Sequence, residues 1–513
     1  MAALATGNTC LAEASFEEEL ATSQRRRKLA EELAVVERRR EAEAARGLAS
    51  LAMVRGDLPK AVRNLRMALQ ADPDDLEAAQ ELGHAWIRRG DLTQAEDVFI
   101  TLIHQAHTLA DQRQEGRARR GLGDVLALQG DAVGATAAYQ EACAMALSLS
   151  HQDPGSARLQ RDLAISYNKL GDRWIAQGDA SKALASYQAG LAISARLAQQ
   201  DPANHLRQHD LSVSHDRVGL GWKALGDSTK ALASFQASLR IRESLCQVDP
   251  QNTAWQRDLA VSQEQVGDRQ MAGGDGARAL ASYRASLRIR AELVRLDPSN
   301  SQWQRDLSVS HDRIGNGCMA QGEAASALAA YQSGLKIRED LVRRDPSNAQ
   351  WQRDCFVSQI KTGDALMALG DSSIALAAYH KSLQVAEGLW RRDPTNLQVL
   401  RDCYVSNMKI GDGLLSQDKG AEALLAYQES LRIADELVGH DPSRSEWQLD
   451  RVACCARLGS MAAFVPLVDR RDYCARGYEI LLALKQTDQS DVSTDWQHWY
   501  EQVMGELDGS DPG

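Results

Sequence analysis

Apolar residues recur every three or four positions through most of the chain, with polar residues between them. Within residues 154–201, Leu163, Tyr167, Leu170 and Trp174 form one such series. A spacing of three to four residues places these side chains on one stripe of an α-helix. The pattern therefore predicts that the first half of this segment is an amphipathic helix.

A second apolar series follows in the same segment, after a short polar interruption. Ala183 and Tyr187 begin the second stripe, and Pro202 ends it. Gly178 suits the left-handed conformation that closes a helix, and Asp179 can accept the first free N–H groups of the next helix. Neither series alternates as a strand does. The segment is therefore predicted to be a helical hairpin.

The hairpin pattern recurs with an insertion-free period of 48 residues. Asp-Pro pairs mark its copies, and their aspartates are Asp153, Asp201, Asp249, Asp297, Asp345, Asp393 and Asp441. Such a period is typical of one structural unit stacked on itself. In several copies the phrase Trp-Gln-Arg-Asp, or a variant of it, follows. Its tryptophans are predicted to pack between neighbouring repeats, with a ligand-binding ladder as the alternative: Trp255, Trp303, Trp351 and Trp447.

The hairpin resembles the tetratricopeptide repeat family, whose pattern is W-x2-L-G-x2-Y, then A-x3-F and a later proline. The pattern is matched by Tyr167, Leu170, Gly171, Trp174, Ala183, Tyr187 and Pro202, and in unextended form by Leu82, Gly83, Trp86, Gly90, Ala95 and Phe99. The resemblance is to a bacterial-type array with an extended repeat, since the family period is about 34 residues. The excess is expected around the Asp-Pro turn, about seven residues on each flanking helix.

The resemblance implies an all-α fold, a right-handed superhelical α-solenoid of stacked helix-turn-helix hairpins. Small residues at the helix crossing are predicted to let the backbones approach, with the aromatic residue filling the adjoining gap. The expected organisation is a charged helix over 1–45 that caps the stack or pairs with another helix, two compact repeats over 46–110, a transitional repeat over 111–154, six extended repeats over 155–442, and a degenerate repeat with a capping helix and tail over 443–513.

Composition narrows the range of partners and compartments. The formal net charge is −11, which disfavours nucleic acid as the main partner. No segment has the roughly 20 apolar residues that a membrane span requires. The N-terminus shows no secretory signal, and the nine cysteines form no C-x-x-C pair. We therefore expect a cytoplasmic protein with buried free thiols that binds neither nucleic acid nor membrane; the sequence leaves its oligomeric state open.

The sequence holds no recognised catalytic motif. We find no phosphate-binding loop, no dinucleotide-binding glycine pattern, no H-E-x-x-H and no G-x-S-x-G. His205 and His209 are four residues apart and could present two imidazoles on one helical face, but no third ligand is evident. Drift within the repeat explains the pair better than a metal site. We therefore expect no catalytic residue, cofactor or metal.

The resemblance also implies a groove lined by the first helix of each hairpin, in which family members hold extended or helical peptides. The positions carried over to this groove are Asn168, Asp172, Asp216, Glu264, Asp268, Asp312, Asn316, Asp364 and Asp412. They lack the cationic clamp that chaperone-tail-binding members use for a terminal carboxylate. This acidic row predicts a basic or neutral polypeptide segment as ligand. The alternative is that the acids pair with nearby cations, namely Lys169, Arg217, Arg313, Lys361 and Lys409.

These features favour a non-catalytic protein-interaction scaffold or adaptor. A second hypothesis is a sensor module that tightens on a peptide or partner and so regulates a separate effector enzyme. A third is an enzyme with an unrecognised site in one of the terminal caps. The first two differ in whether the protein changes shape when it binds, and the third predicts that cap histidines and cysteines are needed for activity.

Overall fold

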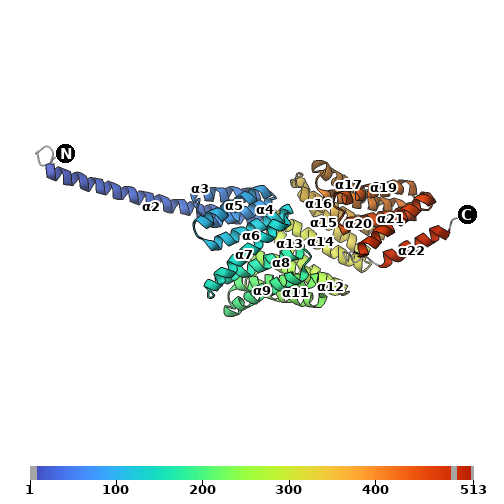
Figure 1. The fold of residues 1–513 in the computed structure, drawn as a ribbon, viewed down its shortest axis with the longest axis horizontal. Helices are drawn as coiled ribbons and strands as arrows, with labels where there is room; N and C mark the ends of the chain where they lie inside the picture. The colour runs from blue at the N-terminus through green and yellow to red at the C-terminus, as the bar shows by residue number, and fades with distance from the viewer. Residues whose placement is uncertain (1–8, 487–493, 510–513) are drawn as a thin grey trace. The chain divides into compact units, whose positions relative to one another are not determined.

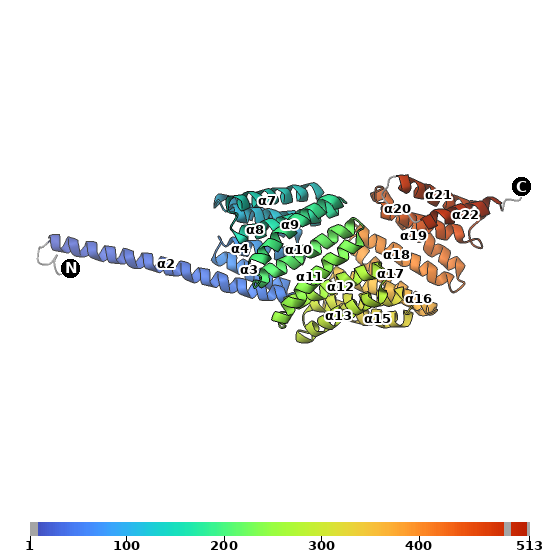
Figure 2. The same ribbon diagram turned by 90° about the horizontal axis from the view of Figure 1, so that it is seen from below.

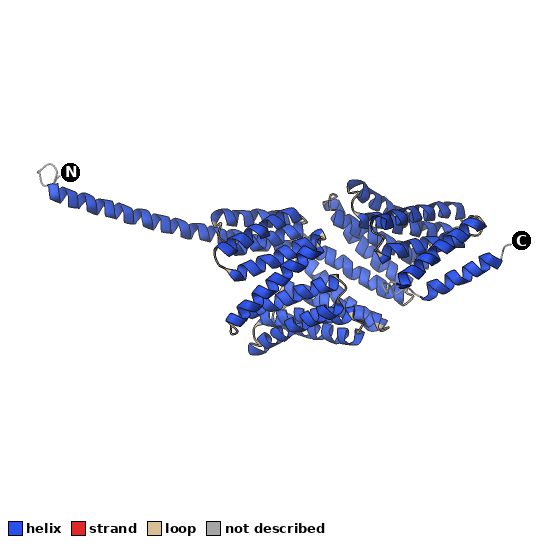
Figure 3. Cartoon of the chain, viewed as in Figure 1, coloured by secondary structure: helices blue, strands red, loops and turns tan. Residues whose placement is uncertain are grey.

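The computed structural model describes residues 9–486 and 494–509, and within these ranges it contains helices joined by turns and no strand (Figures 1 and 3). The chain divides into two compact units, residues 1–269 with 299–302 and residues 270–298 with 303–513. Within each unit, most helices that follow one another along the chain pack side by side. The predicted all-α solenoid of stacked hairpins is confirmed.

The first unit begins with a long helix and continues with hairpins (Figure 2). Its helices are α2 (Thr9–Arg55), α3 (Leu58–Ala71), α4 (Leu76–Arg89), α5 (Leu92–Thr108), α6 (Gln112–Gln129), α7 (Ala132–Gln152), α8 (Ala157–Ala176), α9 (Ala180–Gln200), α10 (His205–Ala224), α11 (Ser228–Val248) and most of α12 (Thr253–Ala272). Ala42, Ala45, Ala49 and Ala52 are buried, because the C-terminal part of α2 packs on α3.

The second unit continues the same alternation of helices. Its elements are α13 (Gly276–Leu296), α14 (Ser301–Ala320), α15 (Ala324–Arg344), α16 (Ala349–Ala368), α17 (Ser372–Arg392), α18 (Leu397–Leu415), α19 (Gly420–His440), α20 (Ser445–Ser460), α21 (Leu467–Gln486) and α22 (Thr494–Gly509). Helix α22 contacts α21, and the Tyr500 hydroxyl donates a 2.6 Å hydrogen bond to the Val452 carbonyl of α20. Helix α22 thus covers part of the last hairpin.

The hairpin tips have the geometry that the sequence predicts. Gly178 adopts a φ of +80°, and the Asp179 side chain accepts a 3.0 Å hydrogen bond from the Lys182 backbone N–H. The same pair of roles recurs at Gly226 with Asp227 and at Gly274 with Asp275. These three tips therefore close one helix and cap the next. At Asp371 and Lys419 the side chain makes no capping hydrogen bond, and at the latter tip Asp418 takes the place of the left-handed glycine.

The helices that flank the Asp-Pro turns are long, as the extended period requires. Helix α4 has 14 residues, whereas α8, α14 and α16 have 20 each. The glutamine of the recurring phrase fixes the turn, since Gln304 Nε2 donates a 2.6 Å hydrogen bond to the Pro298 carbonyl and Gln352 does the same at Pro346. Among the four tryptophans, Trp447 is buried, whereas Trp255, Trp303 and Trp351 are half-buried.

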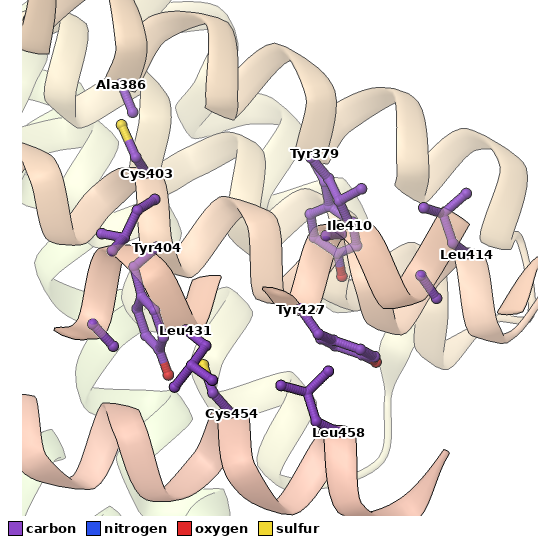
Figure 4. Close-up of a cluster of buried hydrophobic side chains, with 14 of the residues drawn as sticks. Tyr379, Ala386, Cys403, Tyr404, Ile410, Leu414, Tyr427, Leu431, Cys454 and Leu458 are labelled. Atoms are coloured by element: carbon purple, nitrogen blue, oxygen red, sulfur yellow. The ribbon is translucent and has the colours of Figure 1, made fainter. Parts of the chain in front are cut away.

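An aromatic ring lies against a glycine in most of the described hairpins, whereas Gly459 of the last hairpin faces the Cys474 sulfur. A Cβ atom at Gly315 would lie 2.3 Å from the Tyr331 ring, and one at Gly411 would lie 2.4 Å from the Tyr427 ring. The aromatic residue fills space at the crossing as expected, but the atoms next to these glycines belong to the ring and not, as expected, to the backbone of the other helix. In Figure 4, Tyr379 and Tyr427 lie among apolar side chains of the same core, which includes Ile410, Leu414 and Leu458.

Candidate partner-binding groove

The candidate groove is built by the helix that follows each turn between hairpins, here called the first helix. The first helices are α4, α6, α8 and α10 in the first unit and α14, α16, α18 and α20 in the second. Neighbouring first helices are in contact: α6 contacts α8, α8 contacts α10, and α16 contacts α18. Equivalent side chains on them therefore form columns that run from repeat to repeat.

In one predicted column, the residue that follows the ring-contacting glycine in the sequence is an aspartate, as Asp172 follows Gly171. Asp172 accepts a 2.7 Å hydrogen bond from the Tyr187 hydroxyl and lies 3.1 Å from Arg217 Nη1 of the next first helix. Burial raises the pKa of Asp172, and the nearby Arg217 guanidinium opposes that rise. The same triad is formed by Asp124 with Tyr139 and Lys169, Asp364 with Tyr379 and Lys409, and Asp412 with Tyr427 and Arg457.

Three further residues of the predicted row, two amides and one carboxylate, are exposed or half-buried. Asn316 is exposed and accepts a 2.8 Å hydrogen bond from the Tyr331 hydroxyl, in the place that an aspartate takes in other repeats. Asn168 is half-buried and lines a pocket of about 290 Å³ between α8 and α10. Asp268 is half-buried on α12. These positions leave part of each side chain within reach of a partner.

The other predicted column is buried. Asp216, Glu264 and Asp312 are exposed by 8%, 7% and 5%, so they belong to the packing between helices and offer little surface to a ligand. Asp312 lies 2.9 Å from Arg338 Nη2 and 3.2 Å from Lys361 Nζ.

Asp216 lies 2.7 Å from Arg242 Nη2 in the equivalent arrangement. Burial raises the pKa of Asp216, while Arg242 opposes the rise. A carboxylate in such a site depends on its arginine, because the pair is desolvated together.

A second set of ion pairs links neighbouring repeats through the recurring phrase, and sequence reasoning missed it. Arg353 holds Asp402 of the next repeat with two hydrogen bonds of 2.6 and 3.1 Å. Arg305 binds Asp354 and Arg401 binds Asp450 in the same way. The arginine of each phrase thus reaches the aspartate of the next, 49 residues along the chain. The recurrence of Arg-Asp at this period was the available signal.

Of the two histidines, His209 occupies a position of this network and His205 does not. His209 takes the column of Arg161 and Arg305, and its Nε2 lies 2.8 Å from Asp258 Oδ2. His205 contacts the Trp255 ring edge-on at 5.4 Å between centroids. Over the described part of the chain, no group of three or more histidine, cysteine, aspartate or glutamate residues could hold a metal ion. The two imidazoles therefore have separate structural partners.

The cysteines with described side chains are unpaired thiols, and all except the half-buried Cys246 are buried. Burial raises the pKa of Cys355 and of Cys403 to about 12. A thiol of that acidity is almost fully protonated near neutral pH and is a poor nucleophile. The buried cysteines therefore serve as packing side chains of the hydrophobic cores.

Comparison with known proteins gives a family match and fold likenesses. Residues 52–119 match the model of the tetratricopeptide repeat family. No curated protein matches the sequence. The apo form of RapI superposes with a TM-score of 0.50 at 12% identity, over 85% of this chain and 99% of RapI. BtubC (BKLC) from P. vanneervenii gives a TM-score of 0.36 at 19% identity, over 47% of this chain and 90% of BtubC.

The quorum sensor NprR from B. thuringiensis gives a TM-score of 0.43 at 12% identity, over 76% of this chain and 98% of NprR. At these identities, the likeness to RapI concerns the fold alone. Over the described residues, no helix has the length and apolar character needed to cross a membrane. The assignment of function therefore depends on the first-helix columns.

Proposed function

We propose that this chain, which is a tetratricopeptide repeat protein, is a non-catalytic scaffold or adaptor that holds a polypeptide segment of a partner against its first helices. The observation that carries the proposal is the regular column of partly exposed polar side chains on adjacent first helices. Asp172, Asp364 and Asp412 keep 32%, 35% and 32% of their side-chain surface open. Repeated contacts of this kind suit an extended or helical peptide.

The ion pairs bear on the charge of that segment. Three carboxylates of the predicted row, Asp172, Asp364 and Asp412, each have a cation of the following repeat within 3.1 Å. Their pairing favours a neutral segment over a basic one, because a basic ligand would have to displace the intramolecular cations. The proposed contact positions are Asn168, Asp172, Asp268, Asn316, Asp364 and Asp412. The buried acids of the predicted row belong to the packing between helices and are not proposed as contacts: Asp216, Glu264 and Asp312.

The test introduces a charge at an exposed position of the column. Asn316→Lys should weaken binding of a partner that is captured from the native cell and then purified, by about tenfold or more, because it places a long cation where the segment lies. Gln332→Lys makes the same change at an exposed position of the second helix α15 and serves as the matched control. Calorimetry would measure both affinities. Equal affinities for the two variants would remove the first-helix column from the binding surface.

The alternative function is a sensor module that regulates a separate effector enzyme. The fold shared with RapI and the description of NprR as a quorum sensor are compatible with it. Small-angle scattering with and without the captured partner separates the two functions. A sensor should contract on binding, whereas a scaffold should keep its radius of gyration after the mass of the partner is taken into account.

A further inference from the structure

The first-helix face of the first unit contains a hollow that is rich in arginine. One pocket of about 290 Å³ lies between α8 and α10, and another of about 320 Å³ is lined by α4, α6 and α8. The two share Arg113, Arg161 and Ile165 in their linings. They therefore adjoin, and we refer to them together as the arginine-lined hollow.

The hollow contains more cations than carboxylates. Its cations are Arg113, Arg117, Arg120, Arg158, Arg161, Lys169 and Arg207, and its carboxylates are Asp124, Asp162 and Asp210. Glu77 and Asp201 at the rim also contact these cations. Seven cations thus face five carboxylates, which leaves an excess of positive charge in a chain whose formal net charge is −11.

Some carboxylates of the hollow each lie within 4 Å of two cations. Asp162 lies 2.5 Å from Arg113 Nε and 3.6 Å from Arg120 Nη2. Glu77 lies 2.6 Å from Arg117 Nη1 but 3.7 Å from Arg158 Nη2. Arg158 keeps 66% of its side chain exposed. Its guanidinium can therefore donate two hydrogen bonds to a further carboxylate, in the bidentate geometry that arginine favours.

The environment of His84 on the wall of the second pocket agrees with a positive local field. Burial lowers the pKa of His84, and Lys169, Arg117 and Arg120 lower it further, against the opposing charge of Asp124. The lowered pKa favours the neutral imidazole, so the positive charge of the wall comes from the lysine and the arginines and not from His84. An anion entering the hollow would meet several cations at short range.

The apolar part of the lining indicates the class of anion. Ile165, Leu206 and Val213 stand between the charged groups and can receive an aliphatic side chain. The lining contains no Phe, Tyr or Trp on which a base could stack. Single-stranded nucleic acid is held by such stacking together with a long cationic track. These features fit a polypeptide better than a nucleic acid.

We propose that the arginine-lined hollow binds an acidic polypeptide segment in which Asp or Glu side chains flank an aliphatic residue. This inference rests on the proposed scaffold function and adds the chemistry of one part of the partner. Side-chain carboxylates would pair with Arg158 and Arg207 at the rim, and the aliphatic side chain would contact Ile165. A terminal carboxylate is not required.

The test uses a labelled peptide of alternating Asp-Glu and Leu residues with an amidated C-terminus, and a second peptide in which Asn and Gln replace the acids. Fluorescence anisotropy should show about tenfold tighter binding of the acidic peptide at low ionic strength, and the difference should shrink as salt is added. Arg158→Glu should weaken that binding by about tenfold. This variant should fold, because the side chain is exposed in the first turn of α8, where an acidic residue is favoured.

The matched control is Arg240→Glu, which makes the same charge change at an exposed position of the second helix α11. It should leave the affinity within about twofold of the unmodified protein, because Arg240 is in the lining of neither pocket. Equal binding of the acidic and neutral peptides, or equal effects of the two variants, would overturn the proposal. A single-stranded oligonucleotide or inorganic phosphate that competes as strongly as the acidic peptide would overturn the polypeptide assignment. If the captured partner still responds to Asn316→Lys while the acidic peptide does not bind, this inference fails and the scaffold function stands.

Discussion

Replacing Gly315 with alanine should lower the free energy of unfolding of the second unit by about 2 kcal/mol, because the new methyl group has no room. A Cβ atom there would lie 2.3 Å from Tyr331 Cε1 and 2.6 Å from its Cδ1. The ring cannot swing away easily, since Tyr331 is 3% exposed and its hydroxyl is bonded to Asn316. Gly315→Leu should cost more, for the same reason.

A matched glycine separates this steric effect from helix propensity. Gly388 lies inside α17, and a Cβ atom there would meet nothing within 4 Å. Gly388→Ala should therefore raise the free energy of unfolding by about 0.5–1 kcal/mol, because alanine is the better helix former. Urea denaturation followed by circular dichroism, with hydrogen exchange to locate the change, would measure both. Two changes of the same sign would contradict the account of the glycine–ring contact.

The fold could be predicted because the same local sequence features recur in successive repeats. The apolar spacing, the left-handed Gly178 and the capping Asp179 are local features, so one hairpin suffices to read them. The glycine and the ring that meet, such as Gly411 and Tyr427, are also close in sequence. One hairpin can therefore be predicted from residues that are close in sequence, without knowing how the hairpins stack.

The candidate site was less predictable because its partners lie one repeat apart. The sequence named Asp172 and Asp364 and, as the alternative to a ligand-binding role, their pairing with Arg217 and Lys409, which the structure contains. What it did not predict is that each cation comes from the first helix of the following repeat, because this neighbour is set only when the first helices stack. The burial of Asp312 depends on Arg338, which lies 26 residues away on the second helix of the same hairpin. Arginines that recur every 48 residues within an apolar stripe, at Arg242, Arg290 and Arg338, were the signal that could have revealed it.

The buried layer around Arg338 occurs in two forms along the array. In one hairpin the Arg338 guanidinium bonds Ser308, Asp312 and Ser358. One period later, the positions of Ser308, Asp312 and Arg338 are held by the apolar residues Phe356, Ile360 and Ala386. Phe356 and Ala386 are buried in one core and Ile360 packs against it, so the aromatic ring occupies volume that the arginine fills elsewhere. The fold thus accepts either the charged or the apolar form at these three positions, while Ser406 keeps the place of Ser358.

Arg338→Ala alone should therefore lower the free energy of unfolding by about 3–5 kcal/mol, because it leaves Asp312 buried with only the more distant Lys361 as cation. The triple variant Ser308→Phe, Asp312→Ile, Arg338→Ala transplants the apolar form and should recover all but about 1 kcal/mol. Neither buried charge of the Asp312–Arg338 pair then remains, and Lys361, which loses Asp312, has a side chain that is 25% exposed and can be solvated. Denaturation of the single and triple variants would measure this coupling. A triple variant as unstable as Arg338→Ala would show that each layer is fitted to its own hairpin, and that the ion pair is needed for more than balancing its own charges.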